Sequence, residues 1–197
     1  MVPHPFETLD MPDAEVLFYP ALFDPGESDH FLNQLTQHIA WEEQDIKIFG
    51  KMVPVPRLVA WYGDAGKSYS YSGVTMQPLD WTDDLLQIKQ RVEAMAELPF
   101  NSVLLNLYRD ENDSVGWHSD DERELGINPV IASVSFGAER QFQFRHKERT
   151  DLRQAITLTS GSLLLMRGET QHHWKHRIPK SNLSCGPRIN LTFRTIL

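Results

Sequence analysis

The stretch RINLTFR, residues 188–194, alternates polar and apolar side chains at every position. An alternation with a period of two predicts a β-strand whose apolar side chains face a core and whose polar side chains face the other way. The polar face of this strand includes the guanidinium groups of Arg188 and Arg194. The end of the chain therefore predicts a sheet with one apolar face and one strongly polar face.

Other short strands precede this stretch, with turns and no helices between them. We expect them at 103–108, 130–136, 141–145, 155–158, 162–166 and around 172–176. A series of short strands without intervening helices predicts an antiparallel sandwich or barrel. The expected fold class is α+β, with two helices packed outside a jelly-roll core that spans residues 100–197.

Two amphipathic helices are expected before these strands. The first begins with Asp24 as N-cap and Glu27 as the second half of a capping box, and it ends near Trp41. The second spans Thr82–Glu97 and is stopped by Pro99. Apolar residues recur at helical spacing in both segments, so both helices should pack against a sheet.

The N-terminal part of the chain is expected to contain an arm and a hairpin. Residues 1–13 hold three prolines and show no periodicity, which predicts an irregular arm. Between Asp45 and Tyr62 the period changes to two, with the tip of a hairpin at residues 49–51. Pro54 and Pro56 confine the return strand to a sheet edge, because proline cannot donate to a ladder.

The composition is that of one soluble globular domain. Of the 197 residues, 41% are apolar and 23% are charged, which is enough to bury a full core. No apolar run approaches the length of a membrane span, and the N-terminus lacks a signal-peptide pattern. We expect a monomeric protein without a membrane partner, cytoplasmic, or nuclear in a eukaryote. The single cysteine, Cys185, excludes an internal disulfide framework.

The net charge of −8 argues against affinity for nucleic acid over the whole surface. Basic residues nevertheless cluster at 140–149 and at 175–180. These clusters are compatible with a local basic face, and solvated runs of charge are the alternative interpretation.

The triplet His118-Ser119-Asp120 is the first candidate for a metal site. An imidazole and a carboxylate two residues apart on extended backbone project to the same side. Two histidines and one carboxylate on one face of an octahedron hold non-haem Fe(II) and leave positions open. With 8 histidines and 27 acidic residues in the chain, such a pair also arises by chance in a polar turn. A third ligand is needed, and the alternation alone leaves His172 and His176 as alternatives.

The polar face of the last strand is a candidate clamp for an anion. Burying the guanidinium groups of Arg188 and Arg194 without an anionic partner would cost several kcal/mol, roughly 3–5 by analogy with broken ion pairs. Each guanidinium offers two parallel bonds to a carboxylate, so a dicarboxylate is the natural guest. Asn106 and Tyr108, which share parity on an earlier strand, would add two donors. The alternative is that the polar face is exposed to solvent.

Several blocks of sequence, in order along the chain, carry a family resemblance. They are Asn-Leu-Tyr-Arg-Asp (106–110), Trp-His-Ser-Asp-Asp-Glu (117–122), Ile-Ala-Ser-Val-Ser-Phe-Gly (131–137), Phe-Arg-His-Lys (144–147), Gly-Ser-Leu-Leu-Leu-Met (161–166), His-Trp-Lys-His-Arg-Ile-Pro (173–179) and Pro-Arg-Ile-Asn-Leu-Thr-Phe-Arg (187–194). Together they resemble the AlkB family of Fe(II)/2-oxoglutarate dioxygenases, from about Ile46 to the C-terminus. The resemblance implies a single dioxygenase domain over 1–197, with a double-stranded β-helix core and a β-hairpin nucleotide-recognition lid over about 45–75.

The resemblance also implies roles at the active site. It assigns Fe(II) to His118, Asp120 and His176, and it pairs Arg188 with the distal carboxylate of 2-oxoglutarate. The implied co-substrate residues are Asn106, Tyr108, Arg188, Asn190, Thr192 and Arg194. Iron and oxygen would carry the oxidation, while the protein would supply binding and orientation.

Within the family, the blocks at 49–51, 69–73 and 120–125 resemble the branch that repairs alkylated bases in duplex DNA. A flipped base would lie between Tyr71 and His118, and Phe49 would fill the gap in the duplex. The implied substrate contacts are Phe49, Gly50, Lys51, Tyr69, Tyr71, Ser72, Asp121 and Glu122.

The implied activity is oxidative dealkylation of bases such as 1-methyladenine and 3-methylcytosine in DNA. It would convert 2-oxoglutarate and oxygen to succinate and carbon dioxide and release the alkyl carbon as formaldehyde. Alternatives are the same chemistry on RNA or single-stranded nucleic acid, and a jelly-roll binding module that lacks catalysis.

Overall fold

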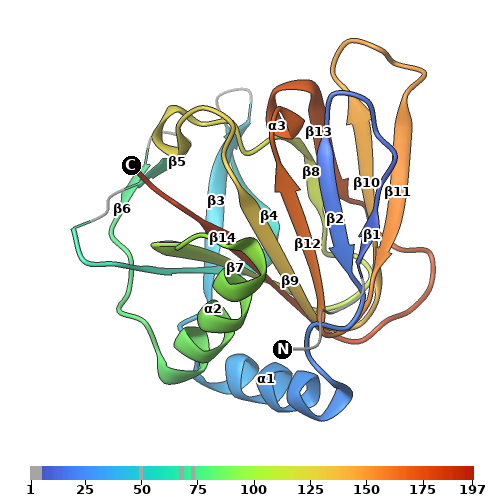
Figure 1. Cartoon of the computed structure of the whole chain (residues 1–197). Coiled ribbons are helices and arrows are strands. Elements are labelled where there is room, and N and C mark those ends of the chain that lie inside the picture. The colour runs from blue at the N-terminus through green and yellow to red at the C-terminus, as the bar shows by residue number, and fades with distance from the viewer. Residues whose placement is uncertain (1–5, 49–50, 67–68, 72–73) are drawn as a thin grey trace.

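Two antiparallel sheets face each other across the molecule (Figure 1). The computed structural model describes residues 6–48, 51–66, 69–71 and 74–197. The large sheet has the order β1 (Glu7–Thr8), β2 (Glu15–Tyr19), β12 (Ser162–Arg167), β9 (Ile131–Gly137), β14 (Arg188–Arg194), β7 (Ser102–Tyr108), β4 (Lys51–Gly63) and β3 (Glu42–Ile48). The small sheet has the order β11 (Arg153–Leu158), β10 (Arg140–His146), β13 (Trp174–Ile178) and β8 (Val115–His118), and β5 (Tyr69–Tyr71) pairs with β6 (Val74–Met76). The α+β jelly-roll class predicted from the sequence is confirmed.

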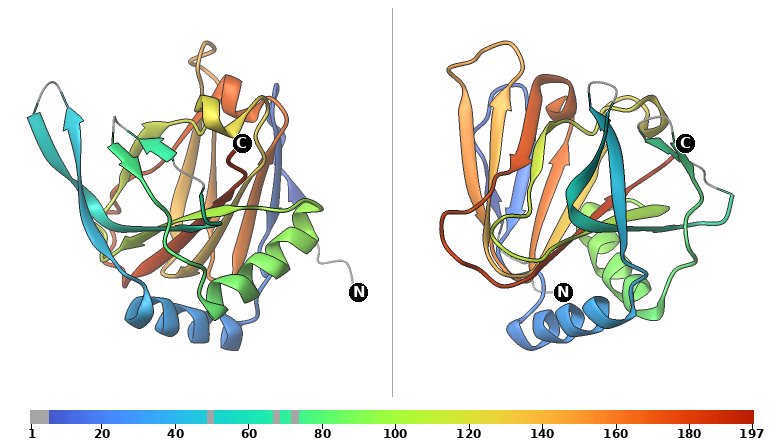
Figure 2. Two further views of the ribbon diagram at one scale, coloured as in Figure 1. Left: turned by 90° about the vertical axis from the view of Figure 1, so that its left-hand side faces the viewer. Right: turned by 180° about the vertical axis from the view of Figure 1, so that it is seen from behind.

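Helices α1 (Pro25–His38) and α2 (Asp83–Ala96) lie together on the outer face of the large sheet (Figures 1 and 2). The predicted capping box is present at α1: the Glu27 amide donates to Asp24 Oδ1 at 2.8 Å, and the Asp24 amide donates to Glu27 Oε2 at 3.0 Å. The remaining helical segments are α3 (Thr170–His173) and a 3-10 turn at Arg123–Leu125. No helix in the described ranges has the length and apolar character needed to cross a membrane.

The apolar residues form two layers on either side of the large sheet. Ile189, Leu191 and Phe193 of β14 pack toward the helices. Between the two sheets, Ile131 of β9 packs in a cluster with Phe144 of β10. The polar side chains of β14 face this second space, so they are enclosed by the small sheet.

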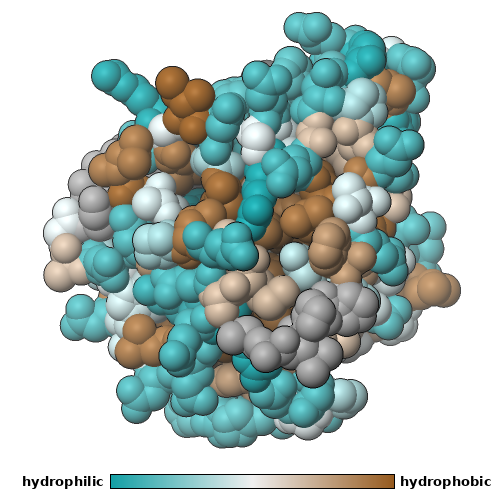
Figure 3. All heavy atoms as spheres, in the orientation of Figure 1, coloured by the Kyte–Doolittle hydropathy of each residue, from teal (hydrophilic) through white to brown (hydrophobic). Residues whose placement is uncertain are grey.

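Hydrophilic side chains cover most of the face shown in Figure 3, and the hydrophobic ones occur in small groups. Ile127, Leu183 and Leu197 are the most exposed large apolar residues of the described chain, and each lies in a loop or at the chain end. Single exposed apolar residues are normal in soluble proteins.

From Phe6 onward, the N-terminal segment contains more regular structure than its sequence predicts, and residues 1–5 of the expected arm lie outside the described residues. Within the expected irregular arm, Glu7–Thr8 form β1 and pair with β2. Strand β2 was not predicted, because it is apolar on both faces: Val16 and Phe18 pack between the sheets, whereas Leu17 and Tyr19 pack toward the helices. A strand buried on both faces shows no alternation.

Strand β4 is an edge strand over only part of its length. Around Pro54 it pairs with β3 alone, whereas from Leu58 onward it also pairs with β7. Around Pro54 the other side of β4 is unpaired among the described strands, so the edge position predicted from Pro54 and Pro56 is right for the first half of β4. It is wrong for the second half, which pairs with β7 inside the sheet. The β3–β4 hairpin projects beyond the rest of the sheet (Figure 2).

Candidate metal and co-substrate site

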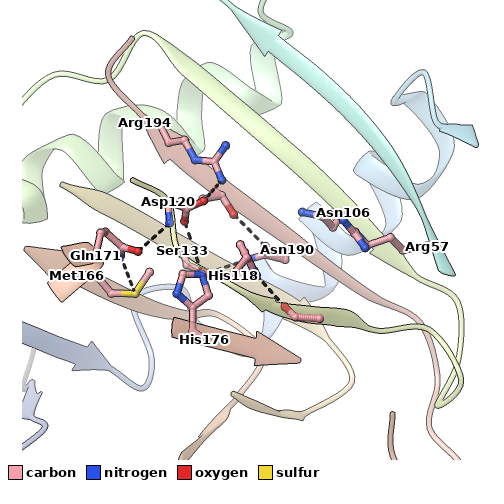
Figure 4. A network of polar contacts seen from close by, with 12 residues as sticks. Arg57, Asn106, His118, Asp120, Ser133, Met166, Gln171, His176, Asn190 and Arg194 are labelled. Carbon is pink, nitrogen blue, oxygen red and sulfur yellow. Dashed lines mark hydrogen bonds and ion pairs between the residues drawn. The ribbon is translucent and has the colours of Figure 1, made fainter. Parts of the chain in front are cut away.

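A cavity opens between the two sheets, and polar side chains converge in it (Figure 4). Its polar lining is Gln44, Arg57, Ser102, Asn106, Tyr108, His118, Ser119, Asp120, Glu122, Ser133, His176, Arg188, Asn190, Thr192 and Arg194. Its apolar lining is Val59, Trp61, Leu104, Val115, Phe142, Met166, Ile178 and Ile196. A few convergent polar groups among apolar walls are typical of a small-molecule site.

His118 and His176 face each other across the ladder of β8 and β13. They are paired in register, and their ring centroids are 4.3 Å apart. Asp120 follows where the chain leaves β8, with Oδ2 lying 3.6 Å from His176 Nε2. One ligand atom from each residue lies within 4.8 Å of the others. By contrast, His172 is exposed and lies in α3.

Two hydrogen bonds hold Asp120 in place (Figure 4). Arg194 Nη2 donates to Oδ1 of Asp120, and the Asp120 amide donates to Gln171 Oε1 at 2.9 Å. Gln171 lies in α3, which leads directly into β13. Its side chain therefore connects the two segments that carry the ligands. Sequence reasoning missed Gln171, because no periodicity relates a helical turn to a loop 51 residues away.

The protonation states of His176 and Asp120 suit the binding of a metal ion. Burial lowers the pKa of His176 to about 3, and the charge of His118 adds to the shift, so the imidazole is neutral near pH 7. Burial alone would raise the pKa of Asp120, but the charges of Arg194 and the two histidines outweigh it and lower the pKa. His118 Nδ1 lies 2.9 Å from the Gly116 carbonyl, which favours a proton on Nδ1 and leaves Nε2 with its lone pair.

The polar face of β14 is enclosed, which excludes the solvent-exposed alternative. Arg188 is 1% exposed, and its Nη2 donates to Ser135 Oγ at 2.9 Å. Its Nε and Nη1 have no hydrogen-bond partner among the described residues. The Arg188 guanidinium lies over the Tyr108 ring, with Cζ 5.1 Å from the centroid. Buried donors of this kind require an acceptor, which an anionic guest would supply.

Two amides in the cavity have fixed orientations. Asn190 Nδ2 donates to Ser133 Oγ at 2.7 Å, and Thr192 Oγ1 donates to Asn190 Oδ1 at 3.0 Å. Asn106 Oδ1 accepts a bond of 2.7 Å from Arg57 Nε. Arg57 was also missed from the sequence, because it lies on β4 between the two prolines and the part of the strand that pairs with β7.

Glu122 and Asp121, two of the expected substrate contacts, differ in their position relative to the cavity. Glu122 lines the cavity, and its Oε2 is buried without a hydrogen-bond partner among the described residues. Asp121 does not line the cavity, and its carboxylate pairs with Lys147 Nζ at 2.7 Å. The backbone of Lys51 belongs to β4 and that of Tyr69 and Tyr71 to β5. The remaining expected contacts, Phe49, Gly50 and Ser72, lie outside the described residues.

Comparison with known proteins assigns this site to a family. The family model described as "2OG-Fe(II) oxygenase superfamily" matches residues 15–194. The chain belongs to the 2OG-Fe(II) oxygenase superfamily. Within this superfamily its relatives are AlkB homologues, as the resemblance of the sequence blocks predicted.

Two groups of relatives illustrate the similarity within the 2OG-Fe(II) oxygenases. The chain is 46% identical over 192 residues to "Alpha-ketoglutarate-dependent dioxygenase alkB homolog 3" of Mus musculus, covering 93% of this chain and 66% of that protein. It is 42% identical over 189 residues to "DNA oxidative demethylase ALKBH2" of Mus musculus, covering 91% and 79%. The chain thus spans slightly less than two thirds of the length of the alkB homolog 3 protein.

A solved structure shares the fold. "The structure of OsALKBH1" superposes with a TM-score of 0.65 at 17% identity, covering 97% of this chain and all of that chain.

The residues present fit the two groups that the superfamily name specifies. His118, Asp120 and His176 supply two imidazoles and one carboxylate, the donor set that suits non-haem Fe(II). The unpaired nitrogens of Arg188 suit a carboxylate of 2-oxoglutarate.

Replacing His176 by alanine should abolish iron binding in the cavity, because one of three ligands is lost. Under anaerobic conditions, wild-type protein with Fe(II) and 2-oxoglutarate should show a weak visible charge-transfer band that His176→Ala lacks. The matched control is His172→Ala, which should keep the band because His172 lies outside the cavity. A normal band in His176→Ala would contradict the ligand assignment.

The metal-free protein should lose stability as the pH falls from 6.5 to about 3. The pKa of His176 is lower in the folded protein than in the unfolded chain. The unfolded chain therefore binds more protons in this pH range, and the free energy of unfolding decreases as the pH decreases. The loss should approach about 1.4 kcal/mol per pH unit, the value for one proton. Urea unfolding of wild type and His176→Asn at several pH values measures it, and an equal pH slope in both proteins would refute the expectation.

Proposed function

We propose that this protein oxidatively removes alkyl groups from alkylated bases of DNA, using Fe(II), 2-oxoglutarate and oxygen. The observation that carries the proposal is the cavity, where two histidines and a carboxylate share the lining with a buried arginine whose Nε and Nη1 have no hydrogen-bond partner among the described residues. Support also comes from the relatives named as alpha-ketoglutarate-dependent dioxygenase and DNA oxidative demethylase.

The protein's part in the reaction is to bind and to orient. His118, Asp120 and His176 would hold Fe(II), which with 2-oxoglutarate and oxygen supplies an oxidation that yields succinate, carbon dioxide and formaldehyde. Arg188 would take the distal carboxylate of 2-oxoglutarate with the two nitrogens that lack partners. Arg194 keeps Asp120 ionised and oriented, so that its carboxylate is ready to bind a cation.

Glu122 is suited to recognise the alkylated base. Bases such as 1-methyladenine and 3-methylcytosine carry a positive charge and an exocyclic amino group that donates hydrogen bonds. The buried Oε2 of Glu122 has no partner among the described residues and would accept such a bond. Asp121 is less suited, because its carboxylate already pairs with Lys147.

Parallel product analysis tests the function. Methylated single-stranded DNA, duplex DNA and RNA are incubated with the protein, Fe(II) and 2-oxoglutarate, and the bases, succinate and formaldehyde are measured by mass spectrometry. We expect unmodified base and formaldehyde in the DNA reactions, with succinate formed in proportion. Repair of RNA alone would move the proposal to RNA, and succinate without repair of any strand would refute nucleic acid as substrate.

The role of Glu122 predicts a matched pair of variants. Glu122→Gln keeps an acceptor oxygen but removes its negative charge, so it should lower kcat/KM on 1-methyladenine by about tenfold, the difference between a charged and a neutral hydrogen bond. Asp121→Asn is the comparison, and its effect should be several times smaller. Equal effects of the two substitutions would show that Glu122 has no special contact with the base.

A further inference from the structure

Arg140 is a buried arginine that joins the ends of several strands. It is 3% exposed. Its Nη1 donates to the Asp110 carbonyl at 3.1 Å, and its Nη2 donates to the carbonyls of Asp113 at 2.8 Å and Pro179 at 2.5 Å. Asp110 and Asp113 belong to the turn between β7 and β8, and Pro179 follows β13. One guanidinium therefore fixes the chain next to both ligand-bearing strands.

The same guanidinium lies over the ring of Tyr108. Arg140 Cζ is 5.7 Å from the ring centroid, and Arg188 Cζ is 5.1 Å from it. Tyr108 and Arg188 line the cavity, whereas Arg140 does not. Arg140 can therefore act on a guest in the cavity only indirectly, through Tyr108, through the charge of its guanidinium or through the backbone segments that it joins.

Positive charge accumulates at this end of the cavity. In the part of the chain that the structure describes, neither Arg140 nor Arg188 forms an ion pair with a carboxylate. Burial lowers the pKa of Arg188, and the charge of Arg140 lowers it further although Tyr108 opposes the shift. Two neighbouring buried cations are costly, and an anion in the cavity would relieve that cost.

The acidic turn between β7 and β8 presents carbonyl groups to Arg140. Arg109 Nε pairs with Asp113 Oδ2 at 2.8 Å, and this i,i+4 contact closes the turn. With the turn closed, the carbonyls of Asp110 and Asp113 both accept bonds from Arg140. The turn is therefore part of the support for Tyr108, the residue just before Arg109.

We propose that Arg140 is a positioning residue for the distal carboxylate of the co-substrate, holding Tyr108 and Arg188 so that the cavity selects a dicarboxylate. This inference rests on the proposed use of 2-oxoglutarate. Arg140 does not touch the reacting atoms, and its effect should be confined to the end of the co-substrate that is remote from the iron ligands.

Equilibrium binding to the Mn(II)-loaded protein tests the inference without turnover. Isothermal titration compares 2-oxoglutarate with 2-oxobutyrate, which has the same 2-oxo acid end but no distal carboxylate. Arg140→Met should weaken 2-oxoglutarate binding by about tenfold, in the range for residues that support a primary ligand, and leave 2-oxobutyrate binding within about twofold. Arg140→Lys, which keeps the charge but not the three-carbonyl geometry, should fall between wild type and Arg140→Met.

Two controls separate positioning from folding. Arg91→Met removes a guanidinium that pairs with Glu27 on the outer side of the large sheet and touches neither the turn nor the cavity, so it should change 2-oxoglutarate affinity by less than about twofold if the effect is specific to Arg140. In the Arg188→Met background, Arg140→Met should have little further effect, because both residues act on the same carboxylate.

The outcomes are distinguishable. Equal weakening of both ligands by Arg140→Met, or unchanged selectivity in the Arg140→Lys protein, would overturn the positioning role while leaving the proposed function intact. Failure of the wild-type Mn(II) protein to bind 2-oxoglutarate would overturn the proposed co-substrate, and this inference with it.

Discussion

Charge enclosed between two sheets is the constraint on which the rest of this structure depends. Asp120, Arg188 and Arg194 are each 8% exposed or less, in a space that is elsewhere filled by aromatic and aliphatic side chains. Such groups stabilise a fold poorly compared with apolar side chains of similar volume. The energy they cost is recovered where a cation meets the carboxylate and an anion meets the guanidinium groups. Fold and binding site are thus two aspects of the same arrangement.

The two sheets contribute different parts of the site. The small sheet supplies the histidines, which the register of β8 against β13 places opposite each other. The large sheet supplies the groups for an anion, carried by β14 between β9 and β7. Because β14 is paired on both sides from Arg188 to Phe193, the polar side chains along this part of the strand have little freedom to shift.

Local sequence patterns predicted those helices and strands that are determined by interactions between residues close together in the chain. The capping box of α1 and the alternation of β14 depend on residues a few positions apart, and both could be read from the sequence. Strand β2 could not, because both of its faces are apolar. The strand parity that kept His172 as a metal candidate failed because a helical turn precedes β13 at that point.

The supporting residues of the site were hidden for a different reason. Gln171, Arg57 and Arg140 act through contacts with segments far away in the sequence, and a single polar residue gives no periodic signal. The choice of His176 over His172 came from the family resemblance. The structure shows its physical basis, because His176 is buried opposite His118 whereas His172 is exposed.

The position of β8 has a topological consequence. This strand is the last of the small sheet, and among the described strands it pairs with β13 alone. The chain just before it is joined to β4 by the bond from the Ser114 amide to the Pro56 carbonyl. His118 and Asp120 therefore lie at a seam between the two sheets rather than at the centre of either. For the proposed substrate, an entrance beside this seam would allow an internal base of a long polymer to reach the site without threading a free end.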